Sequence, residues 1–262
     1  MHSLDFRGRV VAVTGGARGL GRTITETFLA AGADVLVCGR HEPAPADLPR
    51  ATDPDGRDRT AAFFAADIRQ PDQARAMVTA AADRFGRLDV LVNNAGGSPS
   101  VPAAEMSPRL AASVVTLNLL APFYCAQAAN AVMQAQPDGG SIVSIGSVSG
   151  VRPSPLSAAY GAAKAGLVNL TTSLAVEWAP KVRVNCVTAG LLDTGAGDDH
   201  YGGPEGFARV AATIPLGRMG TPADIAAACL YLASPLAAFA TGTNLLVHGG
   251  GEWPAFLAAA RG

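Results

Sequence analysis

The sequence predicts an α/β fold, a doubly wound parallel sheet in a single domain with helices on both faces. Apolar, strand-like runs alternate with alanine-rich helical stretches, which is the order of a parallel sheet with helical crossovers. The strand-like runs are continuously apolar, which is typical of strands buried on both faces. The chain has 262 residues, of which 49% are hydrophobic, enough for one domain with a sizeable core. We therefore treat residues 1–262 as one domain.

The expected elements follow in a regular order. We expect strands at 10–13, 34–38, 61–65, 88–92, 141–145, 182–187 and 244–247. We expect helices at 20–31, 71–85, 107–136, 158–179 and 222–232. Residues 40–60 are rich in proline, aspartate and arginine and are expected to form a loop. The motifs below follow strands, and the carboxyl ends of parallel strands meet at one edge of the sheet, where ligands bind.

Composition excludes several classes of protein. The formal net charge is −1, charged residues make up 16% and no basic block is present, so we expect no binding to nucleic acid or to a membrane surface. The 4 cysteines form no Cys-x-x-Cys pair and no histidine completes metal-ligand spacing, so we expect no metal site. Cys38 and Cys186 lie in apolar strand-like runs and are interpreted as small core residues. We expect a cytoplasmic protein, because such cysteines fit a reducing compartment and the N-terminus has no signal-peptide apolar region.

Two long uncharged stretches, at 110–137 and 225–247, are long enough to resemble membrane spans. The first contains Asn118 and Asn130. The second contains Ser234 followed by Pro235, which is typical of a helix end and a turn. We interpret both stretches as buried segments of a folded domain.

A glycine-rich turn runs from Thr14 to Gly21, directly after the first strand and before a helix. Glycines let the backbone turn sharply and approach a pyrophosphate, and the helix offers free N–H groups and the positive end of its dipole. The alternative is an ordinary tight turn, but the position between a strand and a helix favours a phosphate site. The residues expected to contact a cofactor here are Gly15, Arg18, Gly19, Leu20 and Gly21.

Tyr160 and Lys164 are four residues apart in a predicted helix and therefore share one face. A neighbouring ammonium lowers the pKa of a tyrosine, which is ordinarily about 10, so Tyr160 could exchange a proton with a substrate hydroxyl near neutral pH. Alone, such a pair is usually a surface contact. Ser147 at a strand end and Asn118 in an apolar helix strengthen the catalytic interpretation, although an asparagine in such a helix is most often a core or interface residue.

These motifs together resemble the short-chain dehydrogenase/reductase family, in its compact soluble subtype with 3-oxoacyl reductase-like members. The resemblance covers essentially the whole chain, and the motifs that carry it stand in the right order: the Thr14 to Gly21 turn, Asp67-Ile68, Asn93-Asn94-Ala95-Gly96, Asn118, Ser147, Tyr160-x-x-x-Lys164, Asn185 and Thr194. The resemblance implies a Rossmann-like fold and an oxidoreductase that transfers a hydride between a nicotinamide cofactor and a secondary alcohol or ketone.

The resemblance also implies roles for single residues. Ser147 would hydrogen-bond the substrate oxygen, and Tyr160 would be the general acid/base. Lys164 would lower the pKa of Tyr160 and hold the nicotinamide ribose, and Asn118 would support a proton relay through water to Lys164. Further residues are expected at the cofactor: Asn94 near the fourth strand, Asp67 and Ile68 at the adenine, and Leu192 and Thr194 at the carboxamide of the nicotinamide.

The cofactor is expected to be NADP(H), with NAD(H) possible. Relatives that prefer NAD carry an acidic residue at the end of the second strand, where it accepts from the ribose hydroxyls. Here that position is Gly39, followed by Arg40, whose guanidinium can pair with a 2′-phosphate. Arg18 could reach the same phosphate. The alternative is that Arg40 stacks on the adenine and Arg18 is solvated, which would leave both cofactors usable.

The chain departs from the family pattern in two places. Ala189 precedes Gly190 where the family usually has proline, a change that should alter loop stiffness more than chemistry. A proline-containing loop replaces the helix that usually follows the second strand.

Residues 190–220 are expected to form a mobile substrate lid. Within the lid, His200 is either a substrate contact or a solvated loop histidine.

Two classes of function are compatible with this fold: an active dehydrogenase/reductase, and a cofactor-binding sensor or scaffold without turnover. The joint presence of Asn118, Ser147, Tyr160 and Lys164 favours the enzyme. Its small-molecule substrate stays open among small or hydrophobic secondary alcohols, cyclic or steroid-like ketones and hydroxyacyl thioesters. A carrier-protein substrate is disfavoured, because the end of the long helix has no basic residue. That helix is apolar nearly all round at 110–133. We expect this helix and the Tyr160 helix to pair symmetrically with a second copy, giving a dimer that doubles to a homotetramer.

Overall fold

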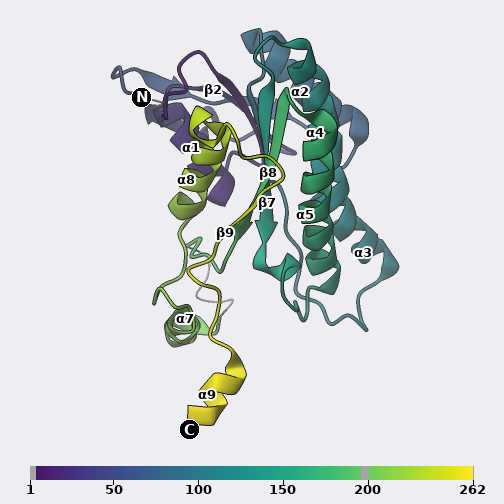
Figure 1. Ribbon diagram of the computed structural model, residues 1–262, viewed down its shortest axis with the longest axis vertical. Coiled ribbons are helices and arrows are strands. Elements are labelled where there is room, and N and C mark those ends of the chain that lie inside the picture. The colour runs from purple at the N-terminus through teal and green to yellow at the C-terminus, as the bar shows by residue number, and fades with distance from the viewer. Residues whose placement is uncertain (1–3, 196–200, 262) are drawn as a thin grey trace.

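The computed structural model describes residues 4–195 and 201–261, and it contains one seven-stranded parallel sheet (Figure 1). The strand order is β5-β2-β1-β6-β7-β8-β9, and every pair in it is parallel. The strands are β1 (Val10–Thr14), β2 (Asp34–Gly39), β5 (Ala62–Ala65), β6 (Val90–Asn93), β7 (Gly140–Ser147), β8 (Val182–Ala189) and β9 (Asn244–Val247). The predicted doubly wound α/β fold is confirmed.

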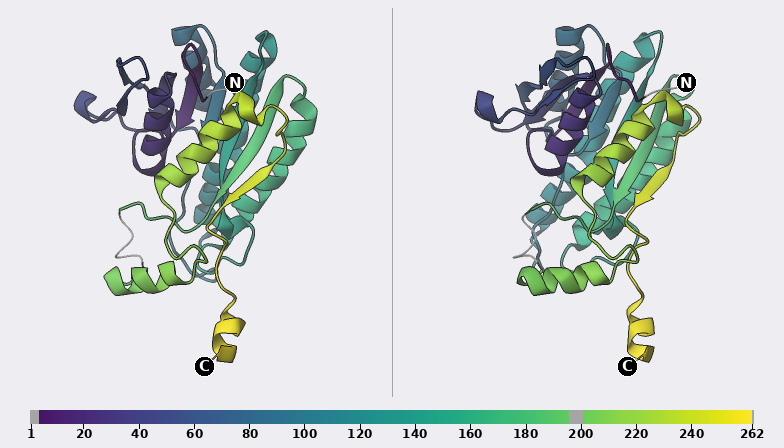
Figure 2. Two further views of the ribbon diagram at one scale, coloured as in Figure 1. Left: turned by 60° about the vertical axis from the view of Figure 1, so that its left-hand side comes forward. Right: turned by 90° about the vertical axis from the view of Figure 1, so that its left-hand side faces the viewer.

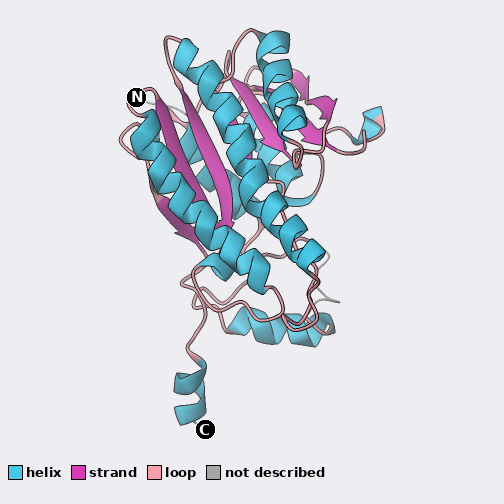
Figure 3. Ribbon diagram, turned by 90° about the vertical axis from the view of Figure 1, so that its right-hand side faces the viewer, coloured by secondary structure: helices cyan, strands magenta, loops and turns pink. Residues whose placement is uncertain are grey.

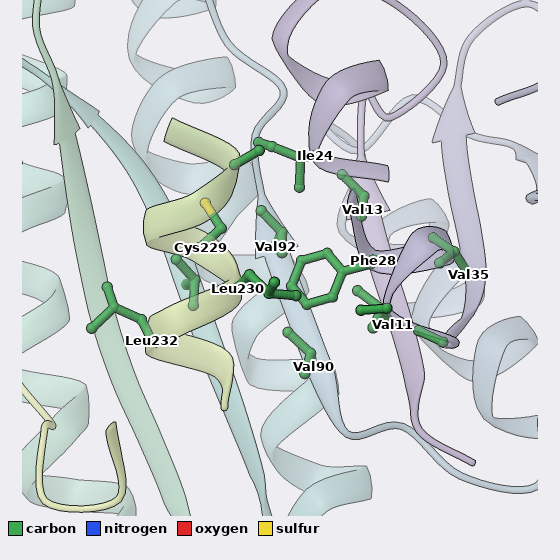
Figure 4. Packing of buried hydrophobic residues seen from close by; sticks show 14 of the residues in the cluster. Val11, Val13, Ile24, Phe28, Val35, Val90, Val92, Cys229, Leu230 and Leu232 are labelled. Carbon is green, nitrogen blue, oxygen red and sulfur yellow. The ribbon is translucent and has the colours of Figure 1, made fainter. Parts of the chain in front are cut away.

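Helices cover both faces of the sheet (Figures 1 and 2). One face carries α1 (Gly19–Ala30) and α8 (Pro222–Ala233), and the other carries α2 (Pro71–Phe85), α4 (Ala121–Ala135) and α5 (Ala158–Trp178). Figure 4 shows the core of the first face, where Phe28 of α1 and Leu230 of α8 pack over Val11 and Val92. Each face therefore has its own apolar core, as the continuously apolar strands require.

The winding of the sheet reverses between β1 and β6, which are neighbours in the sheet but not in the chain. From β1 the chain moves outward to β2 and β5, and it then returns to β6 and continues in the other direction. In sheets with such a reversal, ligands bind beyond the carboxyl ends of the strands at that point. The glycine turn after β1 and the segment after β6 follow the two strands between which the winding reverses.

Residues 40–60 were expected to be a loop, and the structure corrects that expectation. They contain a 3₁₀ turn (Pro45–Asp47) and an antiparallel hairpin of β3 (Arg50–Thr52) and β4 (Asp58–Thr60), which packs against α1. The buried Asp53 organises the turn, because its carboxylate accepts from the N–H groups of Asp55 and Arg57 and from Arg59 Nε at 2.8 Å. The strands are three residues long and polar, so their pattern does not predict them.

The helix expected at 107–136 is divided into three parts: α3 (Pro108–Val115), a π-helical turn (Thr116–Leu120) and α4. Pro122 has no N–H group, so the carbonyl of Asn118 cannot receive the usual bond from four residues later. Among the described residues, Pro108–Ala135 is also the single helical segment long and apolar enough to cross a membrane, and 33% of its most apolar window is buried. A helix that packs on a sheet meets the same test, and this one contacts α2, α5 and strands β6 and β7.

The predicted lid, residues 190–220, contains a helix, α7 (Gly203–Ala212), rather than glycine-rich coil throughout. Asp198, Asp199 and His200 lie outside the described residues. After β9 the chain passes the lid, where the Trp253 N–H donates to the Thr213 carbonyl, and it ends in α9 (Ala255–Arg261). Figure 3 shows α9 extending away from the sheet and its helices.

Candidate active site

In the glycine turn after β1, segments of backbone approach one another closely. Gly15 has φ +64°, in the left-handed region that favours glycine, and its N–H donates to the Cys38 carbonyl at 3.0 Å. A Cβ on Gly21 would collide with the Gly15 carbonyl oxygen. No side chain caps the start of α1 at Arg18, so the first N–H groups of this helix remain available to an anion. This cradle fits the pyrophosphate of a dinucleotide.

Asn94 connects this turn to the end of β6. Its side-chain amide donates to the carbonyl oxygens of Thr14 and Gly15, at 3.0 and 3.3 Å. The Thr14 hydroxyl accepts in return from the N–H groups of Asn94 and Ala95, both at 3.0 Å. Asn94 therefore lies beside the predicted cofactor site, and its amide is engaged in holding the walls of that site together.

The residues expected to select the cofactor lie at the end of β2 and in the glycine turn after β1. Arg40 directly follows β2 and is exposed, as is Arg18 in the glycine turn. A Cβ on Gly39 would come no closer than 3.6 Å to the Phe63 ring, which is an ordinary contact. Gly39 therefore has room for a side chain, such as the acid that relatives preferring NAD carry there, but it has none.

Asp67, expected at the adenine, is held by Arg69. The Arg69 Nε donates to Asp67 Oδ1 at 2.9 Å, and the Asp67 N–H donates to Gln73 Oε1 at 2.7 Å. The Arg69 hydrogen bonds, with a further contribution from the charge of Arg40, lower the pKa of the Asp67 carboxyl. Ile68 next to it is buried in the core under α2.

The hydroxyl pair of the site comes from β7 and α5. Ser147 is the last residue of β7, and its Oγ accepts from the Ser149 N–H at 3.2 Å. Tyr160 lies in the first turn of α5. Burial raises the pKa of Tyr160, while a hydrogen bond with the Ser147 side chain acts in the opposite direction. The two hydroxyls are thus close enough to act on one substrate oxygen.

Lys164 is 3% exposed, and its Nζ donates to the Ile145 carbonyl of β7 at 2.7 Å. Burial lowers the pKa of Lys164 to about 8. Nζ lies 5.6 Å from the centre of the Tyr160 ring. Burial is the largest influence on the Tyr160 pKa in this structure, and the Lys164 ammonium is directed to the Ile145 carbonyl. The lowering of the Tyr160 pKa by Lys164 stays a prediction.

Asn118 lies fully buried in the π-helical turn and binds the loop that follows β6. Its Oδ1 accepts from the Gly97 N–H at 2.9 Å, and its Nδ2 donates to the Gly97 and Val114 carbonyls. The structure thus brings Asn118 to the segment beside Lys164. These bonds also suit the alternative interpretation, an asparagine with a core role, so the relay role of Asn118 stays a prediction.

The residues expected at the nicotinamide lie after β8. Leu192 is half-buried against the core and pairs with Gly220, whereas Thr194 is exposed. Asn185, a further residue of the family pattern, instead binds the Ala240 carbonyl and the Thr243 N–H, so it supports the start of β9.

Sequence reasoning missed three groups of this site: the Ile145 carbonyl, the Gly97 backbone and Arg69. The first two act through peptide groups, which every residue carries, so no residue type could have indicated them. Arg69 could have been found, because it stands two residues after Asp67 and has the opposite charge.

Comparison with known proteins agrees with this geometry. The family described as enoyl-(acyl carrier protein) reductase matches residues 15–252. The 3beta-hydroxysteroid dehydrogenase 1 of Eggerthella lenta is 35% identical over 94% of this chain and 94% of its own length. The L-rhamnose 1-dehydrogenase (NAD(P)(+)) of Azotobacter vinelandii is 34% identical over 92% of this chain and 96% of its own. A putative short-chain alcohol dehydrogenase from Sinorhizobium meliloti has a similar structure, with a TM-score of 0.84, 34% identity and coverage of 94% and 97%.

The chain belongs to the short-chain dehydrogenase/reductase family. It is an oxidoreductase that uses a nicotinamide cofactor for hydride transfer on an alcohol or ketone, with Tyr160 as the general acid/base.

The buried ammonium of Lys164 should lower the stability of the fold. A lysine whose pKa falls from 10.5 to about 8 on folding costs about 3 kcal/mol while it is protonated in both states. Lys164→Met removes that cost but leaves the Ile145 carbonyl without its donor, which costs about 1 kcal/mol. We therefore expect the variant to be more stable by about 2 kcal/mol at pH 7.

Urea unfolding between pH 7 and pH 10.5 measures this effect. The gain should be full below pH 8 and decline as the pH rises toward 10.5, because the parent lysine is then neutral in both states. Lys181→Met, at an exposed lysine, is the matched control and should show no such gain. A Lys164→Met variant less stable than the parent at pH 7 would contradict the cost assigned to the buried charge.

Proposed function

We propose that this protein interconverts an apolar secondary alcohol and its ketone, with four residues in defined roles. Ser147 and Tyr160 bind the substrate oxygen, and Tyr160 gives or takes its proton. Lys164 holds the nicotinamide ribose and replenishes the proton on Tyr160, and Asn118 positions the loop beside Lys164. The observation that carries this proposal is the placement of the two hydroxyls over a buried lysine at the carboxyl ends of the strands.

The cofactor is proposed to lie along the same edge of the sheet. Gly15, Gly19 and Gly21, with the uncapped start of α1, would hold the pyrophosphate, and Leu20 would pack beneath it. The adenosine end would lie near Asp67 and Ile68, and Asn94 would border the centre of the site. Leu192 and Thr194 would contact the nicotinamide end. The bound nicotinamide supplies or accepts the hydride.

The substrate is proposed to be apolar because large hydrophobic side chains are exposed beyond the strand ends. Val151 and Leu156 lie between Ser147 and Tyr160, and both are 51% exposed. Leu216 of the lid is 71% exposed. Leu156 also has a φ of +64°, which is strained for a leucine. Its carbonyl accepts a hydrogen bond from the Val101 N–H. These surfaces favour a ring ketone, as the name of the steroid dehydrogenase relative suggests, over a sugar.

Tyr160→Phe should lower turnover on the order of 10²-fold or more, because it removes the proton donor while leaving the ring in place. The measurement is the loss of reduced-nicotinamide absorbance with decalone and cyclohexanone, and with an enoyl thioester to test double-bond reduction. Cofactor affinity, measured by calorimetry, should change little. Tyr231→Phe, on a tyrosine in the last turns of α8, should keep full activity. Retention of most activity in the Tyr160 variant would contradict the assigned role.

NADP(H) is the proposed preferred cofactor, with NAD(H) possible. Support comes from Gly39, which stands where relatives that prefer NAD carry an acid. Arg40 after it and Arg18 in the glycine turn are both exposed. We expect kcat/KM to be higher with NADP(H) in the parent enzyme. Combined replacement Gly39→Asp and Arg40→Ser should reverse the preference, because it removes the partner of the 2′-phosphate and adds a like charge. A parent enzyme that is faster with NAD(H) would overturn this proposal.

A homotetramer in the cytoplasm is the proposed assembly and location. The helix Pro108–Ala135 keeps apolar side chains only partly buried, among them Leu117 and Leu120, which would pair with a second copy. A second surface is the edge strand β9, on which Leu246 is exposed, and Phe239 is exposed in the segment that leads to this strand. Light scattering at micromolar concentration should give about four times the chain mass of 26.5 kDa. A monomer mass would contradict the assembly.

A further inference from the structure

The segment between β9 and α9, residues 248–254, crosses the lid, and we call it the C-terminal strap. The Leu216 N–H donates to the Gly249 carbonyl at 3.1 Å. Four residues later in the strap, the Trp253 N–H donates to the Thr213 carbonyl at 2.9 Å. The strap is therefore joined by backbone hydrogen bonds at two points to the part of the lid that follows α7.

Glycines in the strap allow this close approach to the lid. A Cβ on Gly249 would lie 2.7 Å from Ile214 Cγ2, and a Cβ on Gly250 would lie 2.9 Å from Pro215 Cγ. Both glycines have positive φ values, +66° and +98°, which a residue with a side chain adopts only with strain. The strap thus packs against the lid through its backbone, so a displacement of one should displace the other.

The strap is also bound to the segment that carries Ser147. Arg152 follows in the turn after Ser147, and its N–H donates to the Val148 carbonyl at 3.1 Å. The Arg152 Nη2 donates to Glu252 Oε1 of the strap at 2.7 Å. The two side chains are 38% and 26% exposed, so solvent screens this ion pair only in part. The pair connects the strap to the substrate end of the active site.

Tyr201, just before α7, lies within electrostatic reach of both partners of the ion pair. Burial raises the pKa of Tyr201, the charge of Arg152 acts to lower it, and the charge of Glu252 acts to raise it. The Tyr201 ring packs edge to face on Phe207 of α7, with 6.2 Å between the ring centres. The lid, the strap and the segment after Ser147 therefore meet at the ion pair, and α7 lies beyond the carboxyl end of the sheet in every view (Figures 1, 2 and 3).

We propose that the Arg152–Glu252 ion pair positions the strap and the lid over the substrate side of the active site, and that it thereby sets the affinity for the substrate. The inference rests on the proposed function, because Ser147 and Tyr160 define where the substrate oxygen lies. The pair acts through the lid and not on the reacting atoms. Breaking it frees the strap from the segment after Ser147, so substrate binding should weaken while the chemical step is retained.

The first test needs no substrate. The sequence contains two tryptophans, Trp178 and Trp253, so Trp178→Phe leaves Trp253 of the strap as the single emitter. In this background, Glu252→Gln removes the charge of the ion pair and keeps the shape of the side chain. Quenching of Trp253 fluorescence by acrylamide, a neutral molecule, should increase because the strap moves more freely. Unchanged quenching would overturn the proposal.

The second test is kinetic, with decalone as the substrate and the reduced cofactor at saturation. Glu252→Gln should raise KM about twofold to fivefold, the scale of a partly exposed ion pair, while kcat changes little. A lower kcat with an unchanged KM would contradict a role in substrate binding.

Glu26→Gln is the matched control. It breaks the Arg22–Glu26 ion pair, which has the same length of 2.7 Å and side chains that are 37% and 34% exposed, but which lies within α1. This variant should leave both KM and the quenching of Trp253 unchanged. Equal effects of Glu26→Gln and Glu252→Gln would mean that the loss of any such ion pair is sufficient, and this would also overturn the proposal.

Charge reversal tests whether attraction between the two side chains is the cause. Arg152→Glu places two carboxylates opposite each other and should raise KM more than Glu252→Gln does. Combining Arg152→Glu with Glu252→Arg restores opposite charges and should recover most of the lost affinity. A double variant that is no better than Arg152→Glu alone would contradict the assigned role.

The results distinguish this inference from the proposed function. Full activity of Tyr160→Phe would contradict the proposed function, and the quenching of Trp253 does not depend on that result. The expected loss of activity in Tyr160→Phe, together with unchanged KM and quenching in Glu252→Gln, would contradict the role of the ion pair alone.

Discussion

The close approach of the β1 turn to the end of β6 is the constraint on which the site depends. Asn94 binds the carbonyls of Thr14 and Gly15, and a Cβ on Gly21 would break this contact. The same segment continues to Gly97, which Asn118 holds. The region expected to hold the pyrophosphate and the region that holds the proton-transfer residues are thus joined by one short stretch of backbone. A shift of either strand end would move both.

The burial of Lys164 is an energetic cost to this fold. An ammonium group that is 3% exposed loses most of its hydration, and one carbonyl bond recovers only part of that loss. Burial also lowers the pKa of Lys164 to about 8, so the group can release and regain a proton near neutral pH. The side chain that is costly for stability is therefore also the one whose pKa suits the proton-transfer role proposed for it. The surrounding apolar core on both faces of the sheet offsets the cost.

Two segments that the sequence did not predict lie outside the sheet. The hairpin of β3 and β4 replaces a helix beside α1, and α7 shapes the lid beyond β8. The similar proteins named above include enzymes whose names refer to a steroid and to rhamnose. In folds of this kind, binding residues are concentrated on segments held by a rigid scaffold, so one framework is compatible with different substrates.

The sequence by itself determined the doubly wound sheet, the position of the glycine turn and the four-residue spacing of Tyr160 and Lys164. These features depend on local periodicity and on residue types with few alternative uses. Its prediction of one continuous helix at 107–136 was wrong in detail, since the proline that forces the π-helical turn lies inside an otherwise uniform apolar stretch. The hairpin was missed because its strands are polar and held by one buried carboxylate, Asp53.

Only the tertiary structure decided how the site residues meet. Asn118, Gly96 and Lys164 are far apart in the chain, and their contacts arise where separate strands end at one edge of the sheet. The direction of the Lys164 ammonium depends on a peptide carbonyl that no residue type encodes. The pKa of Tyr160 likewise follows from burial, which opposes the effect expected from a neighbouring lysine. Spacing along a helix fixes which side chains share a face, but desolvation and backbone polarity are properties of the assembled fold.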